Sequence, residues 1–142
     1  MTHRYIGTKE VVAWHQDGGH KVTAGGPEVQ PGYAVKYEDG YTSWSPKAPF
    51  EAAYRVAEGE TQALAFGHAL HFLKQGRRVA RAGWNGKGMW LQIVSDWSGA
   101  IGEMLPGHRM LPFIGMKTAD NGFVPWLASQ TDMLNDDWCV LP

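Results

Sequence analysis

The sequence predicts an α+β fold, in which short antiparallel β-sheets pack against two helices. Three observations lead to this fold class. Short runs of aromatic and β-branched residues recur along the chain, which is typical of strands. The favoured hairpin turns Asp39-Gly40 and Asn121-Gly122 each separate two such runs. Residues 50–56 and 62–75 carry apolar side chains at helical spacing, so each of these helices would bury one side against a sheet.

The composition of the chain limits the classes of protein to which it can belong. With 142 residues, 44% of them hydrophobic, the chain can form one ordinary domain or two small ones. Its net charge of -1 argues against a general DNA or RNA binder and against a protein of anionic membrane surfaces. The single cysteine, Cys139, excludes an internal disulfide and fits a reducing compartment. No signal peptide and no membrane-spanning segment is predicted, so we expect a cytoplasmic protein.

A short polar stretch at residues 58–61 divides the chain into two predicted segments. It contains a glycine and lies between the end of one helical pattern and the start of the next. We therefore expect an N-terminal module in residues 1–60, built from a β-hairpin and a helix. Residues 61–142 are expected to form a second domain, built from one helix and an antiparallel sheet.

The first segment begins with residues 4–13, which are predicted to form a strand weakened by Gly7. Residues 15–32 contain two glycine pairs and two prolines, and are predicted to be a loop. A hairpin follows, with strands at residues 33–37 and 41–44. The next helix has two possible starting points. Ser45 is a favoured N-cap before Pro46, whereas Pro49 lacks a backbone donor and favours a start nearer to residue 49.

In the second segment, Thr61 is expected to cap a helix at residues 62–75, and Gly76 fits the C′ position just after it. A turn is predicted at residues 85–88, and residues 95–110 are expected to be irregular. Strands are predicted at residues 78–82, 89–94, 113–118, 123–126 and 138–141.

The turn after the first strand of the second segment is a candidate ligand site. Trp84 could stack on a flat base, and the Asn85 amide offers both donors and an acceptor to the edge of that base. Gly86 and Gly88 would allow backbone amides to approach a phosphate, which Lys87 could pair with. The spacing of the glycines fits neither a dinucleotide-binding fingerprint nor a P-loop. The alternative is a plain hairpin turn in which Trp84 covers the core.

A second candidate site follows Trp126, where four polar residues crowd together: Ser129, Gln130, Thr131 and Asp132. An aspartate can bind ribose hydroxyls, and serine or threonine hydroxyls can bind phosphate oxygens. The alternative is helix capping, with Ser129 or Thr131 as the N-cap of a short turn through residues 133–134. The pattern alone leaves both interpretations open.

Other polar residues favour structural roles. Lys117, Thr118 and Asp120 could lie near the same ligand, but an exposed turn explains them better. The basic cluster of Arg77, Arg78 and Arg81 is best explained as a solvated face, with Arg77 and Arg81 on one side of a strand. His68 and His71 have helical spacing but lack further ligands at a recognisable distance, so no metal site is predicted. No catalytic residue and no cofactor is predicted either, because no nucleophile or acid–base pair has a convincing context.

The chain from residue 66 to residue 141 resembles a family encoded largely by phages and prophages, the second type of Thoeris anti-defence protein. The matching segments are Phe66–Leu70, Gly76–Trp90, Leu111–Asp120, Phe123–Asp132 and Asp137-Trp138. This series is long, ordered and specific. In the first segment, residues 5–9 and 32–46 resemble another recurrent phage module.

The resemblance implies a protein that sequesters a signal and does not catalyse a reaction. Members of the family are expected to bind cyclic ADP-ribose-type signals made by bacterial TIR proteins, and some to bind cyclic dinucleotides at a separate site. The expected assembly is a homo-oligomer, a tetramer, with pockets between protomers in the cytoplasm of the infected host. No DNA, RNA or membrane partner is implied. The ligand-facing residues carried over from the family are Trp84, Asn85, Trp126, Ser129, Thr131 and Asp132.

Two other functions stay open on the sequence. An enzyme that degrades such a nucleotide would release more product than the protein present. An interaction module that blocks a host protein would bind no small molecule. In that case Trp84→Ala and Asp132→Ala would not change its activity, if these two residues only line an unused groove.

Overall fold

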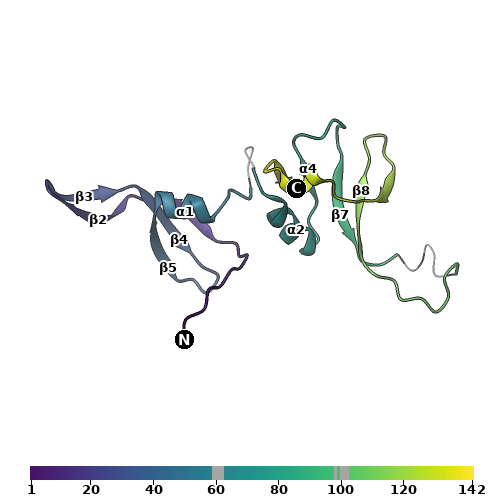
Figure 1. Cartoon of the computed structure of the whole chain (residues 1–142), viewed down its shortest axis with the longest axis horizontal. Helices are drawn as coiled ribbons and strands as arrows, with labels where there is room; N and C mark the ends of the chain where they lie inside the picture. Colours follow the sequence, from purple (N-terminus) through teal and green to yellow (C-terminus); the bar gives the residue numbers. More distant parts are fainter. Residues whose placement is uncertain (59–62, 98, 100–102) are drawn as a thin grey trace. The chain divides into compact units, whose positions relative to one another are not determined.

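The computed structural model of the chain describes residues 1–58, 63–97, 99 and 103–142, with the side chains of residues 20–22 left aside. The chain separates into two compact units, Met1–Arg55 and Val56–Pro142 (Figure 1). The described residues form three antiparallel sheets and three helices, which confirms the predicted α+β fold class. The expected junction at residues 58–61 and the expected Thr61 cap fall, apart from Glu58, outside the described residues.

The N-terminal unit is built on a three-stranded sheet with the order β1-β4-β5. These strands are β1 (Val12–His15), β4 (Gly32–Lys36) and β5 (Thr42–Pro46). The predicted hairpin is confirmed, because β4 pairs with β5 and the amide of Tyr37 donates to the carbonyl of Tyr41 at 2.9 Å. Gly40 supplies the left-handed backbone that this turn needs, with a φ of 85°.

The helix α1 (Lys47–Ala53) packs beside β4, where the rings of Phe50 and Tyr33 stack at 4.3 Å (Figure 1). Neither predicted start is correct, because Ser45 and Pro46 belong to β5 and the helix begins at Lys47. Pro49 is tolerated because it lies in the first turn, where a backbone N–H has no partner within the helix. The helix also ends earlier than expected, since Tyr54 is already extended.

Two predictions for the N-terminal unit are wrong. Residues 4–11 form no strand, and pairing begins only at Val12, where the chain reaches β4. The expected loop at residues 15–32 contains a hairpin of β2 (Gly18–Thr23) and β3 (Gly26–Gln30). Gly18 and Gly19, at the start of β2, do not interrupt this strand but make room for the indole ring of Trp44. A Cβ on Gly19 would lie 2.6 Å from the indole of Trp44.

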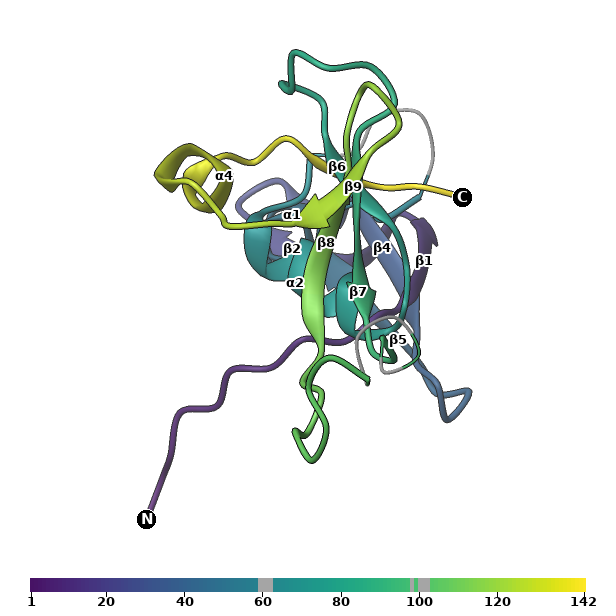
Figure 2. The same cartoon turned by 90° about the vertical axis from the view of Figure 1, so that its right-hand side faces the viewer.

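The C-terminal unit contains a five-stranded antiparallel sheet with the order β10-β6-β7-β8-β9. Figure 2 shows β7, β8 and β9 side by side. The strands are β6 (Val79–Arg81), β7 (Trp90–Val94), β8 (Phe113–Lys117), β9 (Phe123–Pro125) and β10 (Trp138–Val140). All five strands predicted for the second segment are therefore confirmed, as is the hairpin of β8 and β9.

The helix α2 (Phe66–Lys74) begins four residues later than predicted. Leu64 is extended and pairs with Trp138 through two backbone hydrogen bonds of 3.0 and 3.1 Å, so the helix cannot begin before this residue. The predicted end is confirmed. Gly76 has a φ of 81°, and its amide and that of Arg77 bond to the carbonyls of Leu73 and Phe72, as in a Schellman motif.

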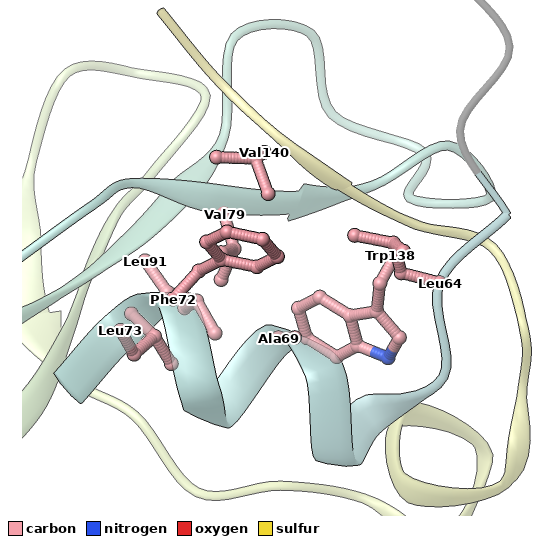
Figure 3. Packing of buried hydrophobic residues seen from close by; sticks show 8 residues of the cluster. All are labelled: Leu64, Ala69, Phe72, Leu73, Val79, Leu91, Trp138 and Val140. Carbon is pink, nitrogen blue, oxygen red and sulfur yellow. The ribbon is translucent and has the colours of Figure 1, made fainter. Parts of the chain in front are cut away.

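The core of the C-terminal unit lies between α2 and one face of the sheet (Figure 3). Its buried side chains are Leu64, Ala69, Phe72, Leu73, Val79, Leu91, Trp138 and Val140. In the N-terminal unit, by contrast, Ala34 and Val35 are the only described apolar residues that are almost fully buried. Among the residues that the structure describes, no helix has the length and apolar character needed to cross a membrane.

Candidate functional site

The candidate ligand residues lie on two segments that meet at one carboxylate, that of Asp132. The first segment is the turn after β6, which carries Trp84 and Asn85. The second leads from β9 into the short helix α4 (Gln130–Leu134). Asp132 is 7% exposed, and it is the only buried polar or charged residue among those described. Its contacts therefore determine how the two segments are arranged.

The start of α4 is fixed by a reciprocal cap between Ser129 and Asp132. The Asp132 amide donates to Ser129 Oγ at 3.1 Å, and the Ser129 amide donates to Asp132 Oδ2 at 2.9 Å. Ser129 Oγ also donates to Asp132 Oδ2 at 2.7 Å. The capping interpretation is therefore confirmed for Ser129. Its hydroxyl lies 2.9 Å from that of Thr131, and both residues are exposed.

The other oxygen of Asp132 binds the first segment. Arg81 Nη1 donates to Oδ1 at 2.8 Å, and the indole Nε1 of Trp84 donates to the same oxygen at 3.1 Å. With the two bonds from Ser129, all four acceptor positions of the carboxylate are used. Burial alone would raise the pKa of Asp132, but the hydrogen bonds from Arg81, Ser129 and Trp84 lower it to about 2.

Arg81 connects this carboxylate to a second one. Its Nε and Nη2 atoms donate to Oδ1 and Oδ2 of Asp137 at 2.8 and 3.2 Å, in the two-pronged geometry that suits a guanidinium. These bonds lower the pKa of Asp137 and raise that of Arg81. The expectation that Arg81 belongs to a solvated face is wrong, because its side chain is only 8% exposed. This side chain can be withdrawn from solvent because both of its acidic partners are present.

Beneath the two segments lies a cluster of three tryptophans. The indole of Trp138 is fully buried, and its Nε1 donates to the carbonyl of Asp132 at 2.9 Å. Trp84 and Trp126 meet Trp138 edge to face, with ring centroids 5.5 and 6.1 Å away, and both are only partly buried. Trp84 therefore does cover the core, as the structural interpretation expected, although the residue is not fully buried.

The exposed candidates lie on the same two segments as the partly buried Trp84 and Trp126. Asn85 follows Trp84 in the turn, whereas Ser129 and Thr131 lie at the start of α4. Trp84 and Trp126 meet edge to face, with their ring centroids 6.5 Å apart. The structure thus brings Trp84, Trp126, Ser129 and Asp132 together. Ligand contact by the six candidates stays a prediction.

The turn at residues 85–88 also packs against the β8–β9 hairpin. Lys117 Nζ donates to the carbonyl of Gly88 at 3.1 Å. A Cβ on Gly86 would lie 2.9 Å from that of Ala119, so only a glycine allows this approach. The expected structural role of the turn between β8 and β9 is confirmed, because the Thr118 hydroxyl donates to Asp120 and accepts from the amide of Gly122.

Three contributors to the site were not predicted from the sequence: Arg81 as a bridge, Asp137, and Gly83. The amide of Gly83 donates to Asp137 Oδ2 at 2.9 Å. A Cβ on Gly83 would lie 2.7 Å from that oxygen. The sequence held one signal for these contacts: a basic residue, Arg81, precedes Trp84, and two acidic residues, Asp132 and Asp137, lie near the C-terminus.

Other features of the chain lie apart from these residues. His68 Nδ1 accepts a hydrogen bond from the amide of Ala65 and so caps the start of α2. The described part of the chain holds no group of three or more His, Cys, Asp or Glu side chains placed for a metal ion. Two hollows, of about 410 and 360 Å³, are lined entirely by residues of the N-terminal unit and contain none of the candidates.

Comparison with known proteins agrees with the resemblance seen in the sequence. The model of the Thoeris anti-defense 2-like domain matches residues 64–141. A curated relative, Thoeris anti-defense 2 of Bacillus phage SP01, is 42% identical over 84 residues, which cover 55% of this chain and 94% of the relative. The matched region contains the five-stranded sheet, α2, α4 and all six candidate residues. The chain therefore belongs to the Thoeris anti-defence 2-like family.

Proposed function

We propose that this chain is a phage anti-defence protein that binds and sequesters cyclic-nucleotide immune signals without cleaving them. The first expected ligand is the glycocyclic ADP-ribose that TIR proteins make. Cyclic dinucleotides such as cyclic GMP-AMP are a second expected class. Family membership supports the anti-defence role, and the geometry around Asp132 supports a binding mechanism.

The observation that carries the proposal is the way in which Trp84 is held. Its indole N–H is bonded to a buried carboxylate, while the residue as a whole is only partly buried and is followed by the exposed Asn85. An indole fixed in this way can stack on a base at little cost in side-chain entropy. The Asn85 amide and the hydroxyls of Ser129 and Thr131 supply polar groups for the base edge, ribose and phosphates.

The lowered pKa values and the hydrogen-bond partners of Asp132 and Asp137 favour binding over catalysis. A general acid or base works best when its pKa lies near the operating pH. The pKa of Asp132 is lowered to about 2 and its acceptor positions are filled. Asp137 is likewise paired with Arg81. A protein that only sequesters its ligand needs affinity and no acid–base pair.

The energetic requirement can be estimated. Sequestration of a signal at micromolar concentration needs a nanomolar site, which corresponds to about 12 kcal/mol of binding free energy. Base stacking provides about 1–3 kcal/mol per base. The larger share must therefore come from phosphate contacts and from a preorganised, desolvated pocket.

Such a pocket could be completed by a second copy of the chain, as expected for a homotetramer in the cytoplasm of the infected bacterium. Large apolar side chains are exposed on both sides of the candidate residues. Leu127 is 91% exposed just before Ser129, and Leu134 is 78% exposed at the end of α4. Exposed apolar side chains on a short helix and on the segment that leads into it are candidates for an interface between copies of the chain.

The test is calorimetric titration of the purified chain with glycocyclic ADP-ribose and, separately, with cyclic GMP-AMP. Each complex is then denatured and the released ligand is analysed by chromatography. Tight binding and intact ligand are expected. Product in molar excess over protein would instead identify an enzyme. A chain that binds neither nucleotide would favour a protein partner.

A matched pair of variants assigns the site. Asn85→Ala changes only an exposed amide, so it should weaken binding at least tenfold (about 1.4 kcal/mol) without changing the melting temperature. Asn135→Ala removes another exposed amide, just after α4, and should leave the affinity unchanged. Equal affinities of the two variants would move the ligand away from the Trp84 turn.

A further inference from the structure

We infer that Arg81 is the positioning residue of this ligand surface. By bridging Asp132 and Asp137, it holds the turn that carries Trp84 and Asn85 in the geometry that binds the ligand. The inference rests on the proposed function, and it assigns a role to a residue that does not itself face the ligand. It also changes the role of Asp132 from ligand contact to support.

The first step of the argument is the convergence of donors. Four consecutive residues, 81–84, donate hydrogen bonds to only two acidic residues. The Ala82 and Gly83 amides donate to the carbonyl and the carboxylate of Asp137 at 3.0 and 2.9 Å. Trp84 and Arg81 donate to Asp132 at 3.1 and 2.8 Å. The turn is therefore attached at every residue before Asn85.

The second step is the chemistry of the guanidinium. Arg81 uses three different nitrogen atoms, of which Nη1 binds Asp132 while Nε and Nη2 bind Asp137. A lysine ammonium is a single point and cannot reproduce this planar fork. Since the Arg81 side chain is 8% exposed, solvent can replace little of what a lysine would lose. The bridge is therefore specific for arginine.

The third step concerns Asp132. Its two oxygens already accept from Arg81, Trp84 and Ser129, so a ligand hydroxyl could bind only by displacing one of these donors. Its contribution to affinity must instead pass through Trp84 and through the cap that orients Ser129 and Thr131. Arg81 supplies the positive charge that allows this carboxylate to stay ionised while buried.

The test compares Arg81→Lys with Arg78→Lys in the full chain. Arg78 is the matched control because it is exposed, lies just before the same strand and packs on the ring of Trp90 at 4.3 Å. Both variants are titrated with glycocyclic ADP-ribose well below their own melting temperatures. A change of stability alone then leaves the Kd unchanged. Arg81→Lys should weaken binding about tenfold, the cost of ordering one or two side chains, and Arg78→Lys less than about twofold.

A spectroscopic measurement separates this inference from the proposed function. The indole N–H signal of Trp84 in ¹H–¹⁵N spectra reports its bond to Asp132 without any ligand. Arg81→Lys should move this signal towards that of a solvent-exposed indole, whereas Arg78→Lys should leave it in place. If the wild type binds the nucleotide and Arg81→Lys binds it equally well, the inference is wrong. If the wild type binds nothing, the proposed function is wrong, and the Trp84 signal alone decides whether Arg81 positions the turn.

Discussion

Asp132 is held ionised by its hydrogen bonds, so its contribution to stability depends on pH. Its pKa in the folded chain is about 2, compared with an ordinary value of 3.8. Because the folded-state pKa is the lower one, the stabilisation is complete above about pH 5 and is lost as the pH falls towards 2. The difference corresponds to about 2 kcal/mol. We expect the urea-unfolding free energy of the wild type to fall steeply between pH 5 and pH 2.5.

The isosteric variant Asp132→Asn isolates this contribution from that of Asp137, whose pKa is lowered as well. At pH 7 the variant should be less stable by about 2–3 kcal/mol, since its amide cannot accept all the donors around it. The deficit should shrink as the pH is lowered. A deficit that stays constant from pH 7 to pH 2.5 would contradict the predicted role of the charge.

At the scale of single residues, the sequence predicted which side chains are suited to stacking and capping, but it did not predict their hydrogen-bond partners. Trp84 and Ser129 were recognisable because stacking and capping are properties of a residue and its near neighbours. The role of Arg81 could not be predicted, because Asp132 and Asp137 lie more than fifty positions away along the chain. Without knowledge of its acidic partners, a run of basic residues is best interpreted as a solvent-exposed face.

At the scale of elements, two glycines at opposite ends of α2 offer a test, because replacing each by alanine should change the stability in opposite directions. Gly76 has a φ of 81°, so Gly76→Ala should destabilise the chain by about 1 kcal/mol. Gly67 lies in the first turn of α2, and a Cβ there meets no atom within 4 Å. Gly67→Ala should therefore stabilise the chain by about 0.5 kcal/mol. Thermal unfolding of both variants measures the two signs, and equal signs would contradict the Schellman geometry.

The elements that the sequence predicted well are those with local signals. The β4–β5 and β8–β9 hairpins followed from their turn residues, and the end of α2 followed from Gly76. The elements that were missed depend on distant contacts. The start of α2 is delayed by the pairing of Leu64 with Trp138. Gly18 and Gly19, at the start of β2, belong to a hairpin because they accommodate Trp44.

At the scale of the whole molecule, the two units differ in how much apolar surface they bury. The C-terminal unit has a contiguous core and contains the whole of the family match. We therefore expect residues 56–142 alone to fold and to bind the nucleotide with the affinity of the full chain. The start at residue 56 keeps Ala57, which packs against that core. Circular dichroism and calorimetric titration check this. A shortened chain that folds but no longer binds would assign part of the site to the N-terminal unit.

The proposed assembly would link the two most exposed leucines among the described residues, Leu127 and Leu134, to the ligand site. If a second copy covers Leu127 and Leu134, a glutamate at either position would bury a charge in the interface, at a cost of several kcal/mol. Leu127→Glu and Leu134→Glu should therefore reduce the mass measured by light scattering from that of an oligomer to that of one chain. Because the pocket is proposed to lie between protomers, the same variants should bind the nucleotide more weakly. Leu111→Glu, at another exposed leucine, is the control and should keep the wild-type mass. A wild-type chain that is monomeric at micromolar concentration and still binds tightly would place the complete site within one protomer.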